Sequence, residues 1–116
     1  MYLKFLKAKI NKVKITGKNL FYEGSITLPP TVIKTADLKP GEAVLCVNLS
    51  NGSRFETYLI EGEKDGEVLL NGGAARLGEI GDELLLLCFV YLEPDEVDYH
   101  KPKILYLDDR NRPRRR

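Results

Sequence analysis

Short stretches in which apolar and polar residues alternate, separated by turn signals, constrain the fold of this 116-residue chain more than any other feature. Residues 12–16 alternate in this way, and residues 55–60 do so less cleanly. A period of two is typical of strands with one buried face. Asn51-Gly52, between residues 43–47 and 55–60, predicts a tight hairpin, because both turn positions favour a positive φ.

The rest of the chain continues this succession of strands and turns. Gly81-Asp82 precedes the apolar residues 84–92, a run that suits a strand buried on both faces. A turn at residues 64–66 precedes another short strand at 67–70, and residues 103–107 suit a last strand. Residues 31–38, bounded by prolines, are the one segment that fits a short helix. Many short strands at this spacing predict an all-β fold, either a closed barrel or a sandwich.

Composition and charge exclude several classes of protein. Hydrophobic residues make up 43% of the chain and charged residues 30%, which are values of a globular domain. No apolar run approaches the roughly 20 residues of a membrane-spanning helix, and lysines interrupt the apolar start, so we expect a cytoplasmic protein without a membrane partner. The net charge is +1, and residues 110–116 hold five arginines. A short basic end without aromatic residues predicts a flexible solvated tail, and no nucleic-acid partner is expected.

Few side chains offer conventional catalysis. His100 is the only histidine, and Cys46 and Cys88 lie far apart in apolar segments, so we expect buried free thiols and no metal site. Gly72-Gly73 lacks the Lys-Ser or Lys-Thr of a phosphate loop, which leaves a backbone turn or a loop whose N–H groups approach an anion. Gly24-Ser25 taken alone indicates a turn.

Taken together, four segments resemble the pyruvoyl-dependent aspartate 1-decarboxylase family. They are Lys9, Tyr22-Glu23-Gly24-Ser25, residues 51–58 and residues 71–75. The resemblance runs from about residue 9 to residue 111, nearly the whole chain. The sequence departs from the family at Asn11, where many members have histidine, and at Gly73, where alanine is frequent. Neither departure removes a proposed catalytic group.

The resemblance implies a single domain over residues 1–109, which would be a six-stranded double-psi β-barrel with short helices, assembled as a homotetramer. It also implies that an inactive precursor cuts itself between Gly24 and Ser25. The products would be residues 1–24, the β chain, and residues 25–116, the α chain, with 110–116 as the flexible tail. A maturation partner is left open.

By the same resemblance, self-cleavage converts Ser25 into a covalently bound pyruvoyl group, with neither a metal nor pyridoxal phosphate. Decarboxylation leaves electrons on the α-carbon of an amino acid, and no standard side chain has a carbonyl able to accept them. The new ketone would bind L-aspartate as a Schiff base. The products would be CO2 and β-alanine, for pantothenate and coenzyme A synthesis.

The resemblance also assigns roles to single residues. Gly24, Ser25 and Thr57 serve self-cleavage, and Tyr58 returns a proton to the α-carbon after CO2 departs. The substrate is bound by Lys9, Arg54, Thr57, Asn71, Gly72, Gly73 and Ala74. Arg54 offers a planar fork for a carboxylate, whereas Lys9 offers a point charge.

Thr57 and Tyr58 are neighbours in a predicted strand, so their side chains face opposite sides. A barrel irregularity or a subunit boundary must reconcile their shared roles.

The alternative that the residues leave open is a small β-barrel that binds anionic ligands or nucleic acid without catalysis. Ser25 would then be a turn residue, and Lys9 and Arg54 would be solvated surface cations. A chain that stays in one piece would favour this alternative.

Overall fold

A computed structural model describes residues 1–114 as one eight-stranded sheet with the strand order β2-β6-β3-β5-β4-β7-β1-β8. This confirms the all-β prediction. The sheet has eight strands rather than the six that the resemblance implies, with the short β2 and β8 at its two ends. The strands are β1 (Leu3–Lys14), β2 (Gly17–Asn19), β3 (Ser25–Leu28), β4 (Ala43–Asn48), β5 (Arg54–Glu61), β6 (Leu69–Asn71), β7 (Glu83–Leu92) and β8 (Lys103–Tyr106). The connecting helices are α1 (Pro30–Thr35) and the 3-10 helices η1 (Gly72–Leu77) and η2 (Pro94–Tyr99).

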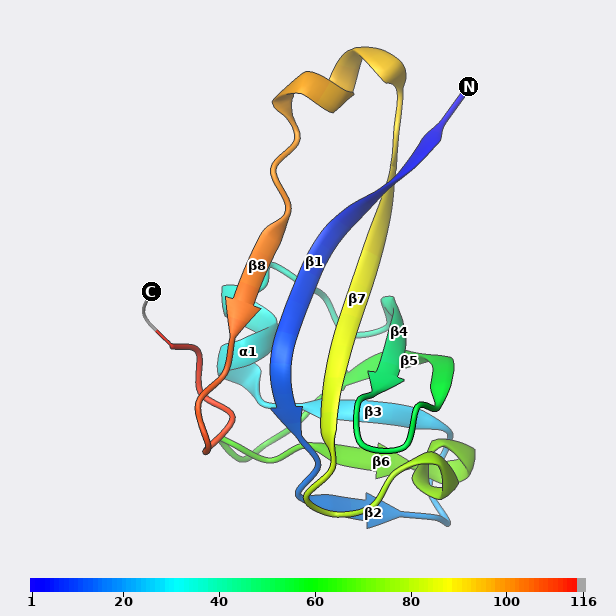
Figure 1. Cartoon of the computed structure of the whole chain (residues 1–116), viewed down its shortest axis with the longest axis vertical. Coiled ribbons are helices and arrows are strands. Elements are labelled where there is room, and N and C mark those ends of the chain that lie inside the picture. The colour runs from blue at the N-terminus through cyan, green and yellow to red at the C-terminus, as the bar shows by residue number, and fades with distance from the viewer. Residues whose placement is uncertain (115–116) are drawn as a thin grey trace.

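The two longest strands, β1 and β7, pair antiparallel along the long axis of the molecule (Figure 1). In that view β2, β3 and β6 run across their lower ends. β8 pairs with the other edge of β1 in parallel. β3 lies between β5, its parallel partner, and β6, its antiparallel partner. Ser25, the first residue of β3, is therefore held in the interior of the sheet rather than at an edge.

The core is formed by one face of the long strands. Leu84, Leu86 and Cys88 of β7 are almost completely buried, whereas the residues between them are half-buried. The expectation that residues 84–92 are buried on both faces is therefore wrong for the single chain, because only one face of β7 meets the core. A bulge between Ile10 and Val13 of β1, with Lys12 at φ 64°, shifts the alternation so that both apolar side chains enter the same core.

The local predictions agree with the structure in type, with some shifts in length. The hairpin is confirmed: β4 and β5 pair antiparallel up to Val47 and Arg54, and Gly52 has φ 81°. The short helix is present as α1, which ends at Thr35 rather than at residue 38.

Both cysteines are buried and free, as expected. Burial raises the pKa of the Cys46 and Cys88 thiols to about 12, so both stay protonated at neutral pH. Among residues 1–114, no helix has the length and apolar character to cross a membrane.

Residues 110–114 differ from the flexible tail that the sequence predicts. Asn111 is 1% exposed and has φ 57°, a conformation that asparagine tolerates. Its Nδ2 donates to the carbonyl oxygens of Lys14, at 2.9 Å, and Gly66, at 3.0 Å, and its Oδ1 accepts from the Lys14 amide at 2.9 Å. The Arg114 amide then donates to the Tyr106 carbonyl. One amide that satisfies three backbone groups thus holds this segment on β1, and residues 115–116 of the expected tail lie outside the described residues.

We expect Asn111→Ala to lower the free energy of unfolding by about 2–4 kcal/mol, because three backbone groups lose the hydrogen-bond partner that the buried Asn111 side chain supplies. Urea denaturation measures this loss. The matched control is Asp109→Ala at an exposed position in the same turn, which should change stability by less than about 0.5 kcal/mol. Equal stability of the Asn111→Ala and parent chains would contradict the anchoring role.

Candidate active site

Ser25 is completely buried, and both capacities of its hydroxyl are used. The hydroxyl donates to the carbonyl oxygen of Glu23 at 3.0 Å. It accepts a hydrogen bond from Asn71 Nδ2, also at 3.0 Å. Ser25 and Asn71 are directly opposite each other in the antiparallel pair of β3 and β6. The register of the sheet therefore places the Ser25 hydroxyl within hydrogen-bonding reach of the Asn71 side chain.

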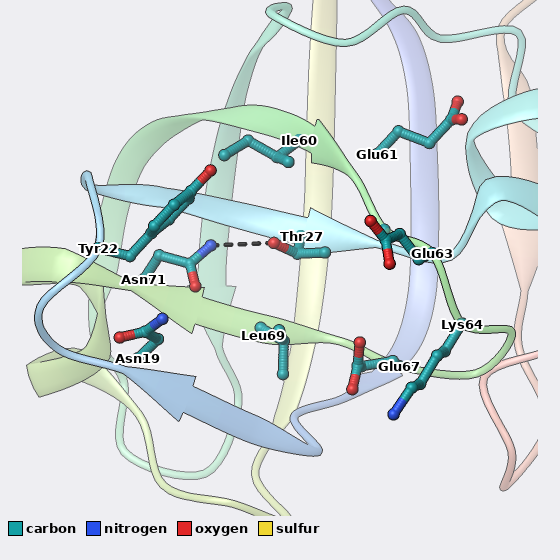
Figure 2. Close-up of a pocket in the computed structure, with 11 residues that line it drawn as sticks. Asn19, Tyr22, Thr27, Ile60, Glu61, Glu63, Lys64, Glu67, Leu69 and Asn71 are labelled. Carbon is teal, nitrogen blue, oxygen red and sulfur yellow. Dashed lines mark hydrogen bonds between the residues drawn. The ribbon is translucent and has the colours of Figure 1, made fainter.

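The Asn71 amide joins two hydroxyl groups of β3. Its Nδ2 also donates to Thr27 Oγ1 at 2.9 Å, a bond drawn in Figure 2. Ser25 and Thr27 are two residues apart in a strand, so their side chains share one face. Sequence analysis selected Asn71 and missed Thr27. The spacing of two from Ser25 was the available signal.

Gly72 brings the loop after β6 against the segment that precedes Ser25. Its φ is +61°, and a Cβ there would lie 2.6 Å from the Gly24 nitrogen and 2.6 Å from the Tyr22 carbonyl oxygen. Because both atoms belong to the backbone, they cannot turn away as a side chain can. Gly73 has no such constraint, since a Cβ there would meet no atom within 4 Å. Ala74 follows in η1 and is buried.

Tyr58 lies on the same face of the sheet as Ser25. β3 and β5 pair in parallel with Ile26 opposite Leu59, and Ser25 and Tyr58 each lie one residue before these partners. The Tyr58 hydroxyl donates to Glu23 Oε2 at 3.4 Å. Partial burial, followed by the nearby Glu23 carboxylate, raises the pKa of Tyr58, so its hydroxyl keeps its proton at neutral pH.

Thr57 points to the opposite face. The register of β4 with β5 is regular here, with Val44 opposite Thr57 and Ala43 opposite Tyr58. The pairing of β4 with β5 has no bulge that would turn Thr57 and Tyr58 to the same face. The barrel irregularity that the sequence analysis considered is therefore absent between these two strands.

The two predicted substrate cations lie on other strands than Ser25, Lys9 on β1 and Arg54 on β5, the parallel partner of β3. Lys9 lies in the middle of β1, opposite Leu87 and Ile104, and Arg54 lies at the exposed start of β5. In the sheet order β5, β4 and β7 separate β3 from β1. Neither cation takes part in the ion pairs found among residues 1–114.

A pocket of about 230 Å³ lies beside the Asn71 amide (Figure 2). Thr27 and Asn71 contribute to its wall, and Glu63 and Glu67 lie on the side away from Tyr22. With Glu61 it has three carboxylates against the single ammonium group of Lys64, a balance that repels a dicarboxylate. Within residues 1–114 no group of three or more His, Cys, Asp or Glu side chains is arranged to hold a metal ion.

Fold and site together define a small all-β protein with a buried, doubly hydrogen-bonded serine at the start of an interior strand. A family model described as aspartate decarboxylase matches residues 1–114. The chain belongs to the aspartate decarboxylase family.

Curated relatives agree with this assignment. A protein of Chloroherpeton thalassium is 42% identical over 99% of this chain and 85% of its own length. A protein of Prosthecochloris aestuarii is 45% identical over 100% of this chain and 91% of its own length. A protein of Kosmotoga olearia is 46% identical over 92% of both chains. All three are named aspartate 1-decarboxylase.

The two neighbouring glycines should respond very differently to alanine. We expect Gly72→Ala to lower the free energy of unfolding by about 2 kcal/mol or more, because positive φ and two backbone clashes both oppose a Cβ. Gly73→Ala, where space is free, should stay within about 0.5 kcal/mol of the parent. Thermal unfolding of both variants tests the pair, and similar losses at the two positions would contradict the close approach.

Proposed function

We propose that this chain is an aspartate 1-decarboxylase that converts L-aspartate to β-alanine and CO2, for pantothenate and coenzyme A synthesis in the cytoplasm. The observation that carries the proposal is the Ser25 hydroxyl, buried after Gly24 and held by Glu23 and Asn71. Family membership and the names of the relatives support it. Neither the family match nor these names favour the alternative of a β-barrel that binds ligands without catalysis.

Maturation begins, in this proposal, with attack of Ser25 Oγ on the carbonyl carbon of Gly24. The new C–O bond replaces the C–N bond between Gly24 and Ser25, and the hydroxyl proton ends on the Ser25 nitrogen. Loss of the Ser25 α-proton then expels Oγ as part of the Gly24 carboxylate and leaves dehydroalanine. Water displaces the nitrogen as ammonia, which leaves the chain as residues 1–24 and as residues 25–116 with a pyruvoyl start.

The residues around Ser25 fit this chemistry. Oγ leaves with Gly24, so the N–H of Asn71 that now points at Oγ would face the departing carboxylate and stabilise its charge. The close approach of Gly72 supports the position of the Gly24 backbone during attack. A pyruvoyl group supplies a ketone that takes up the substrate amine and accepts the electron pair left by CO2.

Tyr58 is the proposed proton donor to the α-carbon. Its place on the same face of the sheet as Ser25 supports this role. Thr57, on the other face, remains assigned to self-cleavage and substrate contact only through the resemblance.

Substrate binding requires more than one copy of the chain in this proposal. Lys9 and Arg54 are assigned to the two carboxylates of aspartate. In the sheet order three strands separate β1, which carries Lys9, from β3, and Arg54 lies at the exposed start of β5. The pocket beside Asn71 is acidic and unsuited to such a substrate. We therefore assign the aspartate site to a boundary between chains of a homotetramer, where Asn71, Gly72, Gly73 and Ala74 complete it.

Intact mass under denaturing conditions tests the proposed maturation. We expect two fragments, one that ends at Gly24 and one that starts with a blocked residue labelled by phenylhydrazine. Ser25→Ala should leave one species of full mass, whereas Ser53→Ala, a control at a hairpin serine, should cleave as the parent does. A parent chain that remains whole after prolonged warming would favour the non-catalytic barrel instead.

Tyr58→Phe separates maturation from turnover. Because the variant keeps the ring but has no proton to donate, we expect normal cleavage and a fall in kcat of about 100-fold or more. β-Alanine formation by mass-verified, cleaved protein is the measurement, and Tyr99→Phe, at an 87% exposed tyrosine, is the control. Full turnover in Tyr58→Phe would remove Tyr58 from the mechanism.

A further inference from the structure

Thr27 has no role in the site as proposed above, yet it occupies a defined place in the network around Ser25. It is 6% exposed on β3. The NH2 group of Asn71 has two hydrogens, and both are used: one reaches Ser25 Oγ at 3.0 Å and the other reaches Thr27 Oγ1 at 2.9 Å. The Thr27 hydroxyl is thus the second anchor of the amide that contacts Ser25.

The network determines which end of the Asn71 amide faces Ser25. The single hydroxyl proton of Ser25 is donated to the Glu23 carbonyl, so Oγ can only accept from Asn71. With the amide turned over, Oδ1 would face Oγ, and the Ser25 proton would have to leave Glu23 to avoid two opposed acceptors. In the observed orientation the Thr27 hydroxyl accepts the second hydrogen of the amide, so that both N–H groups of Asn71 have a partner.

We propose that Thr27 is a positioning residue for self-cleavage, which keeps the N–H end of Asn71 directed at Ser25 Oγ. The inference rests on the proposed maturation chemistry and adds a residue to it. Oγ loses its proton during attack on Gly24, and it departs later in the Gly24 carboxylate. During attack the negative charge develops on the Gly24 carbonyl oxygen, and during elimination it develops on the departing carboxylate that contains Oγ. A fixed N–H donor at Oγ stabilises the charge of the elimination step, whereas a turned amide would present its oxygen.

Thr27→Val is the direct test, because valine keeps the shape of the side chain and removes the acceptor. We expect the rate of precursor cleavage, followed by intact mass, to fall about tenfold. Thr27→Ser restores the hydroxyl and should cleave within about twofold of the parent. Thr35→Val removes the same hydroxyl from an exposed position in α1 and serves as the matched control.

Two further measurements separate positioning from packing. Melting temperatures in a Ser25→Ala background report how each Thr27 change affects the fold without cleavage. In an Asn71→Ala background, Thr27→Val should cause no further slowing, because its effect passes through the amide. If Thr27→Val does not fold, Thr27→Ala is compared with Thr27→Ser, and slower cleavage in the alanine variant alone supports the proposal.

The outcomes distinguish this inference from the proposed function. A parent chain that never cleaves defeats the proposed maturation, and Thr27 with it. A parent chain that cleaves, with a folded Thr27→Val variant that cleaves at the same rate, defeats only the positioning role. The same slowing by Thr27→Val with and without Asn71 would also defeat it.

Discussion

The pairing of Ser25 with Asn71 across β3 and β6 is the contact on which the rest of the site depends. It brings together residues that are 46 positions apart and lets a single amide serve two hydroxyls of β3. Because β3 is hydrogen-bonded on both edges, the serine cannot shift along the sheet without breaking two ladders. Gly72 adds a close backbone contact at the neighbouring segment. The orientation of the Ser25 hydroxyl therefore depends on the pairing of β3 with its neighbouring strands.

Local rules predicted the elements that depend only on neighbouring residues. Alternation and Asn51-Gly52 were enough for the β4–β5 hairpin, since turn chemistry and strand period are local. The bond from Asn71 to Thr27 could not be derived in that way, because it requires the register between β3 and β6. Family resemblance identified Ser25 and Asn71 by motif, but it carried no information about Thr27, which lies outside the quoted motifs. The sequence also could not show that Asn111 satisfies backbone groups 45 and 97 residues away.

Lys9 and Arg54 show a different limit of reasoning from sequence. Their charges suit a dicarboxylate, and the motif match identified both residues. Residue type and motif do not tell which copy of the chain supplies each cation to a given site. In the described chain they lie on β1 and β5, and the pocket next to Asn71 is lined by three carboxylates, those of Glu61, Glu63 and Glu67. A site whose electrophile and cations come from different copies would couple activity to assembly, because an isolated chain would lack part of its binding energy.

The placement of β1 has a consequence for a chain that is cut after Gly24. β1 lies between β7 and β8, and Asn111 is hydrogen-bonded to Lys14 at the end of β1. All of these partners belong to the larger piece. The break would change the connectivity of the polypeptide and leave its architecture intact. The small piece would stay bound as a strand of the sheet, and it would be released only when the large piece unfolds. The mature protein would then keep a fold that its two peptides, once separated, would reform only with difficulty.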